Sequence, residues 1–239
     1  MTNITRIPMS YVCSIVTVPA GRMPASTAEE LNNDLFAKYM DLRTRVFTNE
    51  KGWDVWLPTK NDLDSYDCFD ALYIIAYEPR SNRVLGGARL VCTDRVHKSP
   101  RNQSSTYMIN DAFKGVLKGL PTNICDSQPP QDENVWELTR LVVGDADPSV
   151  ARSVLKASND FLHAQKATKC LFLGPRAFMR MAKGMGYTPV PMGPVVGTPG
   201  DSFLAFETEV LPPFEDGSTD LYALTDYISN SFNKVLFNG

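Results

Sequence analysis

Long apolar runs, histidines, closely paired cysteines and clustered positive charge are all scarce in this chain of 239 residues. The apolar stretch at residues 11–18 is too short to cross a bilayer about 30 Å thick, and the single Arg6 before it does not make a signal peptide. Lysines and arginines are scattered through a chain of net charge -3, so no basic stripe is available for a nucleic-acid backbone. These shortages exclude a membrane span and a nucleic-acid partner.

Cysteine use indicates a reducing compartment. Five cysteines form no close pair, and only His97 and His163 could join them around a metal ion. We therefore expect a cytoplasmic protein with free thiols and no metal site. The cysteines are Cys13, Cys68, Cys92, Cys125 and Cys170.

The length of the chain favours a single domain, residues 1–239, and its sequence pattern predicts both strands and helices. Ser26 and Glu29 have capping-box spacing, and apolar residues then recur at helical intervals to about Phe47. Two apolar runs, 71–77 and 84–92, predict a hairpin within a sheet. Further strands are expected at 11–18, 135–143, 170–173 and 203–210. Further helices are expected at 108–117, 176–183 and 218–236. Another helix should follow Asp147-Pro148, because Asp is a favourable N-cap and Pro a favourable first helical residue. Periodicity alone supports a mixed α/β fold with a central sheet.

Five short motifs follow one another at characteristic spacings. They are Leu42-Arg43-Thr44-Arg45-Val46-Phe47, Gly52-Trp53, Asp62-Leu63-Asp64-Ser65-Tyr66-Asp67, Gly86-Gly87-Ala88-Arg89-Leu90 and Trp136-Glu137-Leu138-Thr139-Arg140. None is diagnostic by itself, but together they closely resemble the acyl-homoserine-lactone synthases, the autoinducer synthases of bacterial quorum sensing. The resemblance covers residues 39–143 and extends more loosely to 194. It implies a GNAT-like fold in which helices flank a mixed, mostly antiparallel sheet with a cleft at a bulged central strand.

The resemblance also implies a reaction. The amine of S-adenosylmethionine attacks an acyl thioester, and the methionyl carboxylate then expels 5'-methylthioadenosine to close an N-acyl-L-homoserine lactone. S-adenosylmethionine is thus a substrate, and no cofactor is expected. The donor is an acyl-acyl carrier protein or an acyl-CoA. The glycine-rich pyrophosphate loop of acetyl-CoA enzymes is missing after residues 135–143, which favours the carrier protein but leaves both donors open.

Aromatic and basic residues near the first helix are expected to bind S-adenosylmethionine. In the resembled family the positions of Arg43, Phe47 and Trp53 belong to that end of the site, and Phe113 and Thr139 complete the substrate-binding set. Composition alone instead places Arg43 in solvent, where arginine is usually found. By the same reasoning, Trp53 would simply pin a loop onto the core.

Asp62, Asp64 and Asp67 place three carboxylates within six residues, and they repel one another unless cations lie nearby. The sulfonium and ammonium groups of S-adenosylmethionine suit such an acidic rim, and a solvated acidic loop is the alternative. The family has glutamate where Asp62 stands, whereas Asp64 and Asp67 match.

Arg89 interrupts an apolar strand and needs a carboxylate partner if it is buried. The candidates are Asp64, Asp67 and Glu137. They would serve either a substrate site or a purely structural ion pair.

Glu137 and Arg140 lie three residues apart in a predicted strand, so they face one site only if a β-bulge between them resets the alternation. An ammonium cannot attack a thioester, so the reaction needs a base, for which Glu137 is the first candidate and Asp64 the second. Arg140 would position the thioester and supply charge near the developing oxyanion.

An acyl pocket is expected around the strand at 170–173 and the helix that follows it. Its predicted walls are Phe172, Phe178 and Met179, although these residues would equally suit an ordinary core. The family often has a threonine near residues 170–175 in members that take 3-oxo chains, and its absence here favours an unsubstituted or unusual acyl group.

Two other functions are also compatible with the sequence. A GNAT-like N-acyltransferase would acylate a different amine and release no methylthioadenosine. A non-catalytic domain that senses acyl groups or nucleotides would bind its ligand without turnover.

Overall fold

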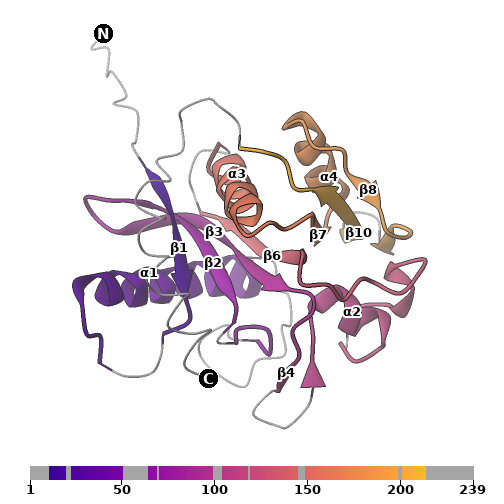
Figure 1. The fold of residues 1–239 in the computed structure, drawn as a ribbon, viewed down its shortest axis with the longest axis horizontal. Helices are drawn as coiled ribbons and strands as arrows, with labels where there is room; N and C mark the ends of the chain where they lie inside the picture. The colour runs from indigo at the N-terminus through magenta and orange to yellow at the C-terminus, as the bar shows by residue number, and fades with distance from the viewer. Residues whose placement is uncertain are drawn as a thin grey trace.

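The structure is a computed structural model, and it describes residues 11–19, 23–50, 64–68, 70–98, 104–117, 119–144, 149–198 and 201–213. An eight-stranded sheet lies at its centre, with the strand order β1-β2-β3-β6-β7-β10-β8 and with β9 paired to β10 (Figure 1). The strands are β1 (Val12–Thr17), β2 (Leu72–Glu78), β3 (Arg83–Cys92), β6 (Val135–Val143), β7 (Lys169–Gly174), β8 (Val190–Pro191), β9 (Val196–Thr198) and β10 (Asp201–Glu209). Within the described residues, β6 and β7 pair in parallel and the other ladders are antiparallel. The predicted fold, a mixed and mostly antiparallel sheet flanked by helices, is confirmed.

Helix α1 (Thr27–Arg43) begins at the predicted cap. The Ser26 hydroxyl accepts a hydrogen bond from the Glu29 N–H at 3.2 Å, and the Glu29 carboxylate accepts one from the Ala25 N–H at 2.6 Å. The helix does not stay α-helical to Phe47, because the chain continues as a π-helix over Thr44–Glu50. Wider turns of this kind are frequent at functional sites.

The two faces of the sheet are covered by different helices. Helix α1 packs on one face, together with the short α2 (Met108–Phe113), whose apolar residues belong to the same core cluster. Helix α3 (Ser149–Ala164) crosses the other face, and α4 (Arg176–Gly184) packs beside β10 on that side (Figure 1). A 3-10 turn, Thr122–Ile124, and a separate two-stranded ladder of β4 (His97–Lys98) and β5 (Ser104–Ser105) complete the described elements.

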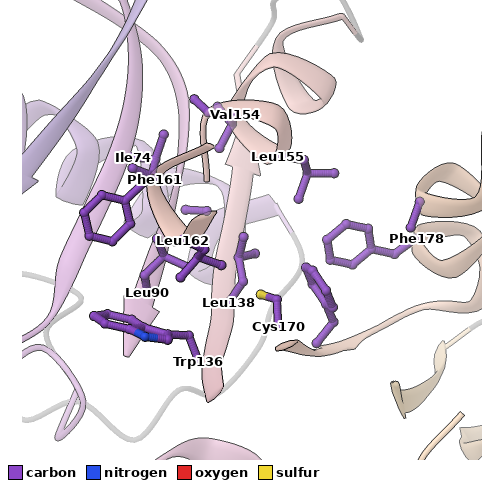
Figure 2. Close-up of a cluster of buried hydrophobic side chains, with 14 of the residues drawn as sticks. Ile74, Leu90, Trp136, Leu138, Val154, Leu155, Phe161, Leu162, Cys170 and Phe178 are labelled. Carbon is purple, nitrogen blue, oxygen red and sulfur yellow. The ribbon is translucent and has the colours of Figure 1, made fainter. Parts of the chain in front are cut away.

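The face under α3 is an apolar core. Figure 2 shows side chains from the sheet meeting those of α3, with Trp136 beside Phe161 and Leu138 beside Cys170. The Trp136 and Phe161 rings meet edge to face, with centroids 5.9 Å apart. Nearly every side chain in this cluster is hydrophobic, so its burial stabilises the fold chiefly through the hydrophobic effect.

A β-bulge interrupts β6 at the predicted place. Thr139 pairs with Arg89, and Val142 pairs with Gly87, so two residues of β6 face a single residue of β3 between these pairs. Arg140 adopts a left-handed backbone with φ of 55°. The extra residue brings Arg140 to the face that Glu137 and Thr139 already share, which is the α1 face.

The long predicted elements are confirmed, including the hairpin of β2 and β3, strand β6 and helices α3 and α4. The predicted helix at 218–236 and the predicted cap Asp147-Pro148 lie outside the described residues. The strands of two or three residues, β4, β5, β8 and β9, are too short to show a periodic pattern. Among the described helices, none combines the length and the hydropathy that a membrane crossing requires.

Candidate active site

A buried network of three arginines and two aspartates lies on the α1 face of the sheet. The five side chains come from four places in the sequence: Arg43 from the last turn of α1, Asp64 and Asp67 from the segment before β2, Arg89 from β3 and Arg140 from the bulge of β6. Charged side chains are rarely buried unless they are paired. Here each carboxylate contacts more than one guanidinium group.

Asp67 is the centre of the network. Its carboxylate accepts hydrogen bonds from Arg43 Nη1 at 2.9 Å, Arg43 Nη2 at 3.2 Å and Arg89 Nη1 at 2.8 Å. The Tyr73 hydroxyl and the backbone N–H of Asp64 also donate to it, at 2.6 Å and 2.8 Å. All three charged side chains are fully buried. This bidentate pairing within a low-dielectric interior fixes the position of the segment that carries both aspartates.

Asp64 links Arg89 to Arg140 at the edge of the network. It accepts hydrogen bonds from Arg89 Nη1 at 2.5 Å and from Arg140 Nε and Nη2 at 3.1 Å and 2.7 Å. Burial by itself would raise the pKa of Asp64, but the charges of Arg89, Arg140 and Arg43 outweigh it and hold the pKa below its ordinary value. Asp64 is therefore a stable carboxylate and a weak base.

Arg140 and Asp64 are the members of the network that reach the surface, with side chains 8% and 11% exposed. The guanidinium of Arg140 lies 5.5 Å from the ring centroid of Phe47, a distance at which a cation–π contact is favourable. Phe47 is itself buried. The aromatic ring and the carboxylate thus hold Arg140 from two sides.

Glu137 lies beside the network but takes a different partner. Its two carboxylate oxygens accept hydrogen bonds from the N–H groups of Met108 and Ile109, the first residues of α2, at 2.9 Å and 2.8 Å. Burial raises the pKa of Glu137 to about 7, although these two N–H groups act in the opposite direction. A carboxyl group with that pKa can accept or release a proton near neutral pH.

The neighbouring residues Thr139 and Tyr66 connect the network to the rest of this face. The Thr139 hydroxyl accepts a hydrogen bond from Arg89 Nε at 3.1 Å. Tyr66 places its ring 5.5 Å from the Arg89 guanidinium and donates its hydroxyl to Asp111 at 3.0 Å. Asp111 in turn accepts from the Thr106 N–H and hydroxyl. Polar groups buried here are therefore satisfied from several elements.

An apolar cavity of about 20 Å³ lies on the opposite face, under α3 and α4. It opens beside the point where the ladder between β6 and β7 ends, at the pair of Leu138 and Phe172. The cavity is lined by Leu138, Leu155, Ser158, Asn159, Leu162, Cys170, Phe172, Phe178, Ala182, Tyr187 and Thr208. The residues of the bulge do not line this cavity, so the cleft predicted at the bulged strand stays a prediction.

Two phenylalanine rings line this cavity, and a third packs against them. Phe172 stacks on Phe206 with centroids 4.9 Å apart, and Phe178 meets both rings edge-on at 5.4 Å and 5.8 Å. Met179 packs against the same core cluster but does not line the cavity. Of the three predicted acyl-pocket residues, the structure thus places Phe172 and Phe178 in the cavity wall.

The structure brings most of the predicted site residues together. Arg43, which composition alone places in solvent, is fully buried, and the expectation of a solvated acidic loop is wrong for Asp64 and Asp67. Of the three carboxylates expected to pair with Arg89, Glu137 instead binds the start of α2.

Among the described residues, Phe113 is a predicted substrate-binding residue that lies apart from the network. Phe113 is half-buried at the end of α2, where it packs against the α1-side core. Trp53 and Asp62 lie outside the described residues. Within the described part of the chain, no group of three histidine, cysteine or acidic side chains is arranged to hold a metal ion.

Two tyrosines in the site were not anticipated from the sequence. Tyr73 donates to Asp67, and Tyr39 donates its hydroxyl to the backbone carbonyl of Arg140 at 2.7 Å. Tyr73 stands in an apolar run and Tyr39 on the apolar stripe of α1, where a tyrosine cannot be told from an ordinary core residue. Their partners depend on strand register and on how α1 docks, which no local pattern reveals.

The chain is similar to known autoinducer synthases. The family model described as "Autoinducer synthase" matches residues 26–190. The acyl-homoserine-lactone synthase of Acinetobacter nosocomialis is 24% identical over 192 residues, which are 76% of this chain and 95% of that protein. The isovaleryl-homoserine lactone synthase of Bradyrhizobium diazoefficiens is 30% identical over 114 residues, 47% of this chain and 43% of that protein.

Solved structures share the fold. The CoA-dependent acyl-homoserine lactone synthase MesI superposes with a TM-score of 0.64 at 18% identity, over 84% of this chain and 90% of that one. The CoA-dependent synthase BjaI, in a structure with S-adenosylmethionine and isopentyl-CoA, gives a TM-score of 0.63 at 19% identity, over 92% of this chain and 90% of that one.

Proposed function

The chain belongs to the autoinducer synthase family, and from that premise we propose that it is an acyl-homoserine-lactone synthase whose active site is the arginine–aspartate network and the cavity behind it. One observation carries this assignment of the site. Residues from the separate motifs, numbered 43, 64, 67, 89 and 140, meet in a single buried network whose exposed edge is Arg140 and Asp64. An isolated structural ion pair would not need five residues from distant segments.

S-adenosylmethionine is the proposed amine substrate. Asp64 is held as a carboxylate at the edge of the network and would attract the ammonium or sulfonium group. Arg43, Arg89 and Asp67 are fully buried around it, so we assign them the role of holding Asp64 in place. The proposed substrate-binding set also includes Phe47, Phe113 and Thr139. It is completed by Trp53 and Asp62, which lie outside the described residues.

Glu137 is the proposed general base. Its pKa of about 7 suits proton transfer near neutral pH, whereas the depressed pKa of Asp64 makes that second candidate weaker. The base removes a proton from the methionyl ammonium, directly or through a water molecule. The free amine then attacks the thioester carbonyl, forms the amide bond and releases the carrier thiol.

Arg140 is the proposed stabiliser of the developing oxyanion. It is fixed by Asp64 and Phe47, so its charge is oriented before the reaction begins. Lactone closure follows when the methionyl carboxylate attacks its own γ-carbon and the C–S bond breaks, which neutralises the sulfonium as methylthioadenosine leaves. This step depends chiefly on holding the substrate in a curled conformation.

The cavity under α3 is the proposed acyl site. At about 20 Å³ the cavity has room for little more than a water molecule, so an acyl chain would bind there only if the rings of Phe172 and Phe178 move apart, which favours a compact chain. Of the similar proteins, one acts on an isovaleryl group and others are CoA-dependent, so an acyl-CoA stands beside acyl carrier protein as a proposed donor.

We also propose a cytoplasmic location and no cofactor. All five cysteines are free thiols, as a reducing compartment requires. The proposed reaction uses S-adenosylmethionine as a substrate and draws every proton and leaving group from the two substrates and the protein.

The test is to incubate the purified chain with S-adenosylmethionine and a panel of acyl-carrier-protein and acyl-CoA donors, and to measure methylthioadenosine and acylated lactone by mass spectrometry. We expect both products in equal amounts. Acylated product without methylthioadenosine would contradict lactone synthesis and indicate another N-acyltransferase. Glu137→Gln and Arg140→Ala test the assigned roles, since normal product formation by either variant would contradict them.

A further inference from the structure

The bulge that aims Arg140 is held from the opposite layer by a tyrosine on α1. Tyr39 is fully buried, and its hydroxyl donates to the carbonyl oxygen of Arg140 at 2.7 Å. Arg140 is the residue with the left-handed backbone, a conformation that costs free energy for a side chain other than glycine. A hydrogen bond to that carbonyl stabilises the bulged conformation.

The opposing strand provides the space for this tyrosine. A Cβ atom on Gly87 would lie 2.9 Å from Cε2 and 3.0 Å from Cδ2 of Tyr39, so the ring rests directly on the glycine backbone. Gly87 pairs with Val142, the first regular pair after the bulge. The glycine thus lets the aromatic ring lie close enough to the sheet for its hydroxyl to reach the Arg140 carbonyl.

The ring also contacts other members of the site. Its centroid lies 5.6 Å from that of Tyr73, which donates to Asp67, and 5.8 Å from the guanidinium carbon of Arg43. Burial raises the pKa of Tyr39 above its ordinary value, so the phenol stays protonated and remains a donor. The tyrosine is therefore packed on three sides, with its hydroxyl at one defined position.

We propose that Tyr39 is a positioning residue for Arg140: its hydroxyl fixes the bulge of β6 and thereby orients the guanidinium toward Asp64 and the reacting thioester. The inference rests on the proposed role of Arg140, and it assigns no substrate contact to Tyr39. A misplacement of a charged group by a fraction of an ångström is enough to lower the rate of an oriented reaction.

Tyr39→Phe tests the proposal, because it keeps the ring on Gly87 and removes only the hydroxyl. We expect kcat for methylthioadenosine release to fall about tenfold, while KM for S-adenosylmethionine changes less than twofold. Tyr11→Phe is the matched control. Tyr11 shares a hydrogen bond of 2.9 Å with Ser153 on the α3 side, and its loss should leave kcat unchanged.

A double-mutant cycle separates positioning from general weakening of the fold. If Tyr39 acts through Arg140, Tyr39→Phe should cause no further loss of kcat in an Arg140→Ala background. Losses that multiply in the double variant, or a kcat of Tyr39→Phe equal to that of the unaltered protein, would overturn the proposal.

Hydrogen–deuterium exchange of residues 138–143 provides a readout that does not depend on activity. We expect at least tenfold faster exchange there in Tyr39→Phe and no change in Tyr11→Phe. Unchanged protection at the bulge would refute the role of Tyr39 even in an inactive protein. Absence of both products from the unaltered chain would instead refute the proposed function, so the two failures are distinguishable.

Discussion

Both faces of the central sheet have a hydrophobic core, but the buried arginine–aspartate network lies on only one of them. Under α1, the largest fully buried side chains include Arg43 and Arg89, and they are held by Asp64 and Asp67. Under α3 the core is formed by hydrophobic side chains beside the buried Ser158 and Asn159, and Phe172 and Phe178 line its cavity. The charged face derives its rigidity from directional bonds, whereas the apolar face derives stability from packing that can adjust to a guest. One fold can thus fix a charged substrate precisely on one side and select an acyl chain by size on the other.

Removal of one charge from the network should have the largest effect. Asp67→Asn leaves Arg43 and Arg89 without their shared carboxylate in a fully buried site, so we expect the free energy of unfolding to fall by about 3 to 5 kcal/mol. Urea denaturation measures this loss. Asp34→Asn is the control, because its exposed pair with Lys38 is worth only about 0.3 to 0.5 kcal/mol. Equal losses in the two variants would contradict a structural role for the network.

Truncation on the apolar face should alter specificity as well as stability. Phe178→Ala removes a ring from the cavity wall, so we expect a loss of about 3 kcal/mol and a shift of preference toward longer acyl chains. Competition between donors of different length measures the shift. Phe36→Ala removes a similarly packed ring under α1 and should destabilise the fold without changing that preference. A change in KM for S-adenosylmethionine larger than the change in donor preference would contradict the assignment of the two faces.

The pH dependence of stability should separate Glu137 from Asp64. Burial raises the Glu137 pKa from 4.5 to about 7, so its folded form prefers the proton. Its contribution is fully present below pH 4.5 and is lost as pH rises through about 7, a change of about 3 kcal/mol. Asp64 has a lowered pKa, and its contribution is lost only as pH falls below its ordinary range. We expect Glu137→Gln to flatten the unfolding free energy between pH 4.5 and 7, and an unaltered slope there would refute the raised pKa.

The smallest expected effect comes from a single methyl group on the α1 face. In Gly87→Ala the new Cβ would lie 2.8 Å from the Ile74 carbonyl oxygen and 2.9 Å from Tyr39, and we expect a loss of about 2 kcal/mol. Gly184→Ala in α4 has no neighbour within 4 Å of the added atom and should be neutral. Thermal denaturation of both variants measures the contrast, and a neutral Gly87→Ala would show that α1 can move away from the sheet.

Elements with strong periodicity could be predicted from the sequence, and so could the bulge. The hairpin of β2 and β3 follows from two apolar runs, and the bulge follows from the requirement that Glu137 and Arg140 serve one site. The burial of Arg43 also had a local signal, since it continues the stripe of Phe36 and Tyr39 on α1. Composition alone placed it in solvent because it ignores that stripe.

The partners of the buried polar groups could not be predicted from local sequence. Tyr39 and Arg140 are 101 residues apart, and their hydrogen bond depends on the docking of α1 on a bulged strand. Likewise, the sequence made Glu137 a candidate partner for Arg89, but two N–H groups at the start of α2 donate hydrogen bonds to both of its carboxylate oxygens. Which donor a buried carboxylate binds depends on the tertiary arrangement of the elements, and the spacing of residues along the chain does not reveal that arrangement.

The early end of the ladder between β6 and β7 has a consequence for where the two substrates can meet. The two strands pair only as far as Leu138 and Phe172, although they continue to Val143 and Gly174. A continuous sheet would separate an amine under α1 from an acyl chain under α3 by a full layer of backbone. In the proposed reaction, the thioester carbonyl would pass between the layers where the strands are no longer paired, close to Arg140. The separation of the strands there would then limit how bulky a group can be next to the carbonyl, independently of how long a chain the acyl site accepts.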